Sequence, residues 1–142
     1  MDTSSSANVG DGPGRARWRW ALAGFAVLEL TLIVAAVGWV AIYSHLLAPG
    51  HDLAAYQAYA SVASPIVSVI AGIPAFWAAG RILRRRLGGD ARRTALVMAG
   101  IWVAVYALLM LTFAENQGYN WAMAILSNVS KVGALILGVK RR

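Results

Sequence analysis

Cysteine is absent from the 142-residue sequence. Its absence excludes disulfides, thiolate metal sites and the CxxC pairs of redox-active membrane proteins. Charge is also scarce, because charged residues make up 13% of the chain against about 25% in an ordinary soluble domain. With 59% hydrophobic residues and a mean hydropathy of +0.60, the chain has too little polar surface to cover a water-soluble globule. The composition therefore excludes a soluble enzyme, a soluble nucleic-acid binder and a disordered chain, and it predicts a polytopic membrane protein.

Catalytic motifs are missing as well, since the chain contains no GxSxG, HExxH or phosphate-loop pattern. We therefore expect no catalytic residue, no cofactor, no metal site and no enzymatic activity. His45 and His51 fall at one predicted edge of the membrane, where we interpret them as solvated interface residues rather than metal or haem ligands. Asp52 stands directly before an amphipathic stretch and is expected to cap the helix that follows.

Long apolar runs dominate the rest of the sequence. Residues 1–14 are small, polar or helix-breaking and predict a disordered cytoplasmic tail. Residues 15–142 are predicted to form one transmembrane domain, because each apolar run can cross a bilayer as a helix of about 20 residues. We thus predict an all-α integral membrane protein with four transmembrane helices in an up-down-up-down bundle. The predicted helices cover residues 20–46, 55–83, 94–114 and 119–139.

Positive charge is distributed very unevenly along the chain. The two predicted connections at 47–58 and 114–119 contain no Lys or Arg, whereas twelve of the thirteen basic residues flank the other helix ends. By the positive-inside rule, both termini and the middle connection face the cytoplasm. The excess of Arg over Lys, eleven against two, and the abundant Ala suggest a bacterial source and hence the inner membrane. The twelve residues are Arg15, Arg17, Arg19, Arg81, Arg84, Arg85, Arg86, Arg92, Arg93, Lys140, Arg141 and Arg142.

Two ionisable residues of opposite sign lie deep inside the predicted helices. Glu29 is about ten residues from the cytoplasmic end of the first helix, and Lys131 is about eight residues from that of the fourth. An ionisable group at such depth costs several kcal/mol unless it is paired, protonated or hydrated. We predict an ion pair between them, with a structural role and a functional role both left open. The alternatives are a snorkelling lysine and a protonated glutamate.

Other polar or aromatic side chains lie near this depth. Asn128 is three residues from Lys131 and shares its helix face, so it completes the candidate polar site Glu29, Asn128 and Lys131. Trp102 and Tyr106 are one turn apart on the third helix, and we interpret them as packed core, with the wall of a cavity as the alternative.

The second predicted helix carries a face of small residues. Ser61, Ser64, Ser68 and Gly72 recur at spacings of three and four, which allows another backbone to approach closely. We predict that this face packs against another helix or a partner protein. Two prolines in the same helix, Pro65 and Pro74, predict kinks.

These features favour a small inner-membrane protein that acts as an accessory or interaction subunit. The alternative is a small oligomeric proton-coupled transporter built around the Glu29/Lys131 pair. Expected partners are the lipid bilayer, with anionic headgroups at Arg84–Arg93, and another membrane protein or a second copy of the chain. The basic cluster labels one side of the membrane and does not argue for nucleic acid.

Overall fold

The structure is a computed structural model that describes residues 13–112 and 121–140. These residues are helical except for a short turn after residue 47 and for Lys140, and no strand occurs among them. The prediction of an all-α fold is confirmed. The helices are α1 (Pro13–Ile42), α2 (Leu53–Leu87), α3 (Ala91–Thr112) and α4 (Trp121–Val139), with a π-helical turn η1 (Tyr43–Leu47) and a 3-10 turn η2 (Gly88–Asp90).

The first helix begins earlier than predicted. Pro13 and Gly14, expected in the disordered tail, belong to α1, while residues 1–12 of that tail lie outside the described residues. Proline suits the first helical turn because its missing N–H needs no partner there. At its other end α1 continues into η1, where the amide of Ala48 donates to the Tyr43 carbonyl at 2.9 Å.

The turn between η1 and α2 is held by side-chain hydrogen bonds. Asp52 accepts from the Ala55 amide at 2.8 Å, which confirms the predicted helix cap. The Tyr56 hydroxyl donates to the Ala48 carbonyl at 2.9 Å and accepts from the His51 amide at 3.2 Å. The turn is therefore an ordered connection that fixes how α1 and α2 meet.

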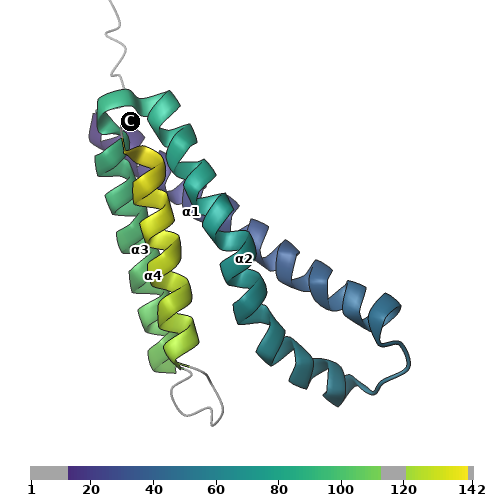
Figure 1. Cartoon of the computed structure of the whole chain (residues 1–142). Helices are drawn as coiled ribbons and strands as arrows, with labels where there is room; N and C mark the ends of the chain where they lie inside the picture. The colour runs from purple at the N-terminus through teal and green to yellow at the C-terminus, as the bar shows by residue number, and fades with distance from the viewer. Residues whose placement is uncertain (1–12, 113–120, 141–142) are drawn as a thin grey trace, which may run out of the picture.

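The second helix is continuous through both of its prolines, Pro65 and Pro74, and it is visibly bent (Figure 1). It ends at Gly88, whose positive φ of 52° favours glycine. The short turn η2 then leads directly into α3. Residues 84–93, predicted as the basic loop between the second and third helices, are therefore largely helical. The predicted connection at residues 114–119 lies outside the described residues.

Three helical stretches are long and apolar enough to cross a membrane. They are Arg17–Leu47, Leu53–Thr112, which contains both α2 and α3, and Trp121–Val139. Large apolar side chains are exposed along all of them, among them Leu46, Ile70 and Leu111. Exposed apolar surface of this extent is uncommon on a soluble monomer. The helices are thus compatible with a membrane protein.

Helix packing is uneven. In Figure 1, α3 and α4 run side by side, while the far parts of α1 and α2 lead away from them. α2 packs most extensively against α4, and α1 packs against α2 and α3 but makes few contacts with α4. The buried core lies where all four helices approach one another, around Phe76, Met98, Trp102 and Leu135.

Gly80 of α2 and Gly138 of α4 meet at a close helix crossing. A Cβ atom added at Gly80 would lie 3.0 Å from the Gly138 Cα atom and would overlap the Leu135 carbonyl oxygen. A Cβ atom at Gly138 would overlap the Trp77 carbonyl oxygen in the same way. Only glycine permits this approach at both positions.

Candidate functional site

Lys131 is the charged residue at the centre of the molecule. It lies on α4 and only 1% of its surface is exposed. Its ammonium group donates a hydrogen bond to the Ser68 hydroxyl of α2 at 2.5 Å. The aliphatic stem passes over Gly72, where an added Cβ would lie 2.7 Å from the lysine Cε. The ammonium is therefore held by α2, and Gly72 supplies the space for its stem.

Two aromatic rings of α3 face the same ammonium group. Trp102 and Tyr106 are stacked with their ring centroids 4.7 Å apart and their planes 23° from parallel. The Lys131 Nζ atom lies 5.5 Å from the Trp102 centroid and 5.9 Å from the Tyr106 centroid. Both distances fall within the range of cation–π attraction, which reaches about 2 kcal/mol when the cation is desolvated.

Glu29 approaches this aromatic pair from α1. Its carboxylate oxygens accept from the Tyr106 hydroxyl at 3.3 and 3.4 Å, and the side chain is half-buried. Glu29 attracts the Lys131 charge electrostatically. The predicted ion pair is nevertheless not formed, because no contact within 4.0 Å joins the two charged groups in the described structure. The physical reason is that α4 packs on α2, so Ser68 rather than Glu29 meets the ammonium.

Asn128 completes the cluster from α4. Its side-chain carbonyl accepts from the Trp102 indole N–H at 2.9 Å. Trp102 also contacts Phe76 of α2 and Phe25 of α1 edge to face, with centroid distances of 4.6 and 5.6 Å. Trp102 is thus the residue through which the polar site touches every helix.

The structure brings all three residues of the candidate polar site into one cluster, although by different contacts from those expected. We define the polar cluster as Glu29, Ser68, Trp102, Tyr106, Asn128 and Lys131. Trp102 and Tyr106 belong to the packed core, as the sequence predicted, and Tyr106 also lines a groove. Their contacts with Lys131, Asn128 and Glu29 were not predicted. Their position, one turn apart at the depth of the ionisable residues, was the available signal.

The predicted small-residue face of α2 is used unevenly. Ser68 and Gly72 contact Lys131 of the same chain, whereas Ser64 is half-buried and Ser61 is exposed. Part of the face is therefore used within the chain, and the part nearer the start of α2 has no such use.

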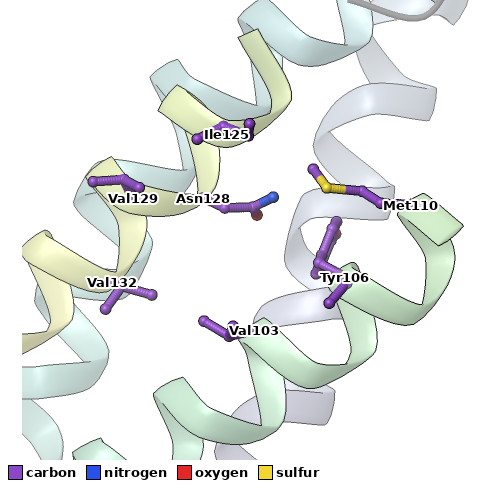
Figure 2. A pocket seen from close by; sticks show the side chains of 8 residues that line it. Val103, Tyr106, Met110, Ile125, Asn128, Val129 and Val132 are labelled. Atoms are coloured by element: carbon purple, nitrogen blue, oxygen red, sulfur yellow. The ribbon is translucent and has the colours of Figure 1, made fainter. Parts of the chain in front are cut away.

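A groove of about 300 Å³ lies between α3 and α4 (Figure 2). Its walls are apolar except for Tyr106 and Asn128. Figure 2 shows the Asn128 amide directed from α4 toward α3, with Met110 and Val103 on the opposite wall. The volume is at the lower end of the range for small-molecule sites.

Over residues 13–112 and 121–140, no group of three or more His, Asp or Glu side chains could hold an ion. A separate feature of α4 is Ser127, which is buried and whose hydroxyl has no hydrogen-bond partner in the described structure. The arrangement can fix helix positions and hold one desolvated cation.

Comparison with known proteins gives no further assignment. No family model matches the chain, and neither a curated protein nor a solved structure matches it. The class that the fold defines is an all-helical protein whose apolar helices could span a membrane.

Proposed function

We propose that the chain is a four-span protein of the bacterial inner membrane that serves as an accessory or interaction subunit without catalytic activity of its own. The observation that carries this proposal is the poor internal coverage of its apolar helices. Within the apolar window of Arg17–Leu47, 11% of the residues are buried, against 39% for Trp121–Val139. The first span therefore relies on lipid or on another protein for most of its contacts.

The positions of the basic residues support an orientation with both termini in the cytoplasm. The Nη2 atom of Arg17, near the start of α1, lies 3.8 Å from the Oδ1 atom of Asp90 in the α2–α3 connection. Arg84 at the end of α2 donates to the carbonyl of Lys140, just after α4, at 2.9 Å. These contacts gather the basic helix ends at one end of the molecule, as the positive-inside rule requires of a four-span protein.

The distal arm, which we define as residues 34–64, supports an interaction role. In Figure 1 this part of α1 and α2 leads away from α3 and α4. The arm is internally braced, because the Tyr43 and Tyr59 rings stack at 3.5 Å and the Trp39 indole donates to the Tyr59 hydroxyl at 2.8 Å. A braced arm with apolar residues such as Leu46, 74% exposed, suits a helical partner.

Photo-crosslinking in native membranes tests this role. A benzoylphenylalanine at Ser61, which is exposed on the distal arm, should give one adduct of defined mass with a different polypeptide. The matched control is Val129 on α4, which is also exposed but lies outside the arm, and it should give no protein adduct. Equal labelling at both positions, or no protein adduct at Ser61, contradicts the subunit role. An adduct of twice the chain mass identifies a second copy as the partner.

The alternative is a small oligomeric proton-coupled transporter, and the polar cluster favours it. Glu29 and Lys131 carry opposite charges and both contact the Trp102–Tyr106 pair. If the cluster transports, Glu29→Gln and Lys131→Met abolish solute-dependent proton entry into proteoliposomes, measured with a trapped pH dye and a panel of organic cations. If the cluster is structural, both variants lose stability and the wild type moves no protons with any solute. Recovery of stability in the double variant then supports coupling between the two residues.

A further inference from the structure

Three arginines line a notch at the end of α2. The notch has a volume of about 270 Å³ and is bounded by Arg81, Arg84 and Arg85. Their spacing of three and four residues places them on one side of the helix. None of the three has a carboxylate partner in the described part of the chain, and Asp90, the nearby acidic residue, is engaged by Arg17. Among the described residues, the notch is therefore a concentration of positive charge without a carboxylate partner.

The same side of α2 becomes apolar above the notch. Trp77 lies four residues before Arg81, and Ile73 and Ile70 lie four and seven residues before Trp77. All three are exposed, with Ile70 at 70% and Trp77 at 48%. We call these three side chains the apolar track. It places isoleucines, then an indole, then guanidinium groups along one helix face, which is the order of a bilayer from hydrocarbon to headgroup.

Local contacts hold the arginines in place. The Arg81 guanidinium lies over the Trp77 ring, 5.3 Å from its centroid. Arg84 uses one N–H on the Lys140 carbonyl, and its other donors remain for a ligand since a guanidinium has five. The field of the α2 helix end favours nearby cations in general. This field alone does not explain why three arginines line a notch next to the apolar track.

We propose that this notch binds the phosphate of one anionic phospholipid, whose acyl chains lie along the apolar track. Arginine forks match phosphate oxygens in geometry and in charge. The apolar track selects a lipid over a free phosphate, because a soluble anion gains nothing from exposed isoleucine and tryptophan side chains. This inference rests on the membrane location in the proposed function and adds a defined lipid site to it.

Native mass spectrometry of the detergent-purified full chain tests the site. With phosphatidylglycerol added, the wild type should retain one lipid, and with phosphatidylcholine it should retain none. A variant with Arg81→Gln, Arg84→Gln and Arg85→Gln should lose about 100-fold in apparent affinity, since each arginine that contacts the bound phosphate is worth about fivefold. Excess inorganic phosphate should not displace the lipid.

The matched control removes the same charge from neighbouring positions. Arg86, Arg92 and Arg93 are exposed and do not line the notch, so changing all three to Gln should alter the affinity less than fivefold. Equal losses in both triple variants, no headgroup preference in the wild type, or displacement by inorganic phosphate would each overturn the proposal. Alkaline extraction of native membranes separates the two failures: a chain released by carbonate contradicts the membrane location, whereas a retained chain without lipid preference contradicts the lipid site alone.

Discussion

Gly138→Ala should destabilise the protein through the α2–α4 crossing. The added methyl group would overlap the Trp77 carbonyl oxygen and would lie 3.1 Å from the Gly80 Cα and 3.2 Å from the Arg81 amide nitrogen. All of these are backbone atoms, so no side-chain rotation can relieve the overlap. The two helices must therefore separate.

The size of the effect follows from the contact distances. Carbon atoms pack at about 3.5–4.0 Å, and a radial gap of about 0.5–1 Å already forfeits a quarter to a half of each contact. Because α2 and α4 form the most extensive helix pair in the chain, we expect a loss of about 1–3 kcal/mol in the free energy of unfolding. The separation should also weaken the Lys131–Ser68 bond, since Lys131 lies two turns from Gly138 on the same face of α4.

The matched control is Gly133→Ala on the same helix. No atom lies within 4 Å of a Cβ built at Gly133. The control should be neutral or stabilising by up to about 1 kcal/mol, because alanine is the better helix former. Unfolding is measured by far-UV circular dichroism in mixed micelles titrated with sodium dodecyl sulfate. If the two variants are equally stable, or if Gly138→Ala is as stable as the wild type, the close approach of α2 and α4 at Gly138 is refuted.

Three further substitutions test the polar cluster by the same titration. Lys131→Met keeps most of the buried volume and removes the charge-assisted bond, so it should cost about 1–3 kcal/mol; unchanged stability would show that the ammonium contributes nothing. Trp102→Phe removes the indole N–H that Asn128 accepts, and we expect a loss of about 1 kcal/mol, at the scale of interhelical hydrogen bonds in membranes. Tyr106→Phe should cost less, about 0.5 kcal/mol, because its bonds to Glu29 are long at 3.3 and 3.4 Å; a larger loss than for Trp102→Phe would reverse this order.

Local features of the fold could be predicted from the sequence, because they depend on neighbouring residues. Apolar runs long enough to span a bilayer are helical in the structure. The Asp52 cap was predicted because a carboxylate before an amphipathic stretch has the free amides of the next turn within reach. The basic connection after α2 was predicted as a loop, yet it is largely helical, since the three-residue turn η2 suffices to connect α2 to α3.

The neighbours of each helix could not be predicted. Matching depth and opposite charge favoured contact between Glu29 and Lys131, but depth says nothing about which helices adjoin. That choice follows from shape at Gly80 and Gly138, two of fourteen glycines in the chain. Their close approach brings α4 onto α2 and turns Lys131 toward Ser68. Such contacts depend on the rotation of each helix about its own axis. This rotation cannot be predicted from any single residue of the sequence.

Labelling of single cysteines tests the four-span topology most directly, and the natural absence of cysteine means that each introduced thiol is the only one. His51→Cys lies in the α1–α2 turn, Gly89→Cys in the α2–α3 connection and Lys140→Cys after α4, and all three positions are exposed. With a membrane-impermeant maleimide, the account predicts that His51→Cys is labelled in intact spheroplasts and that the other two are labelled only after the membrane is permeabilised. Labelling of Gly89→Cys or Lys140→Cys in intact spheroplasts, or protection of His51→Cys, would contradict it.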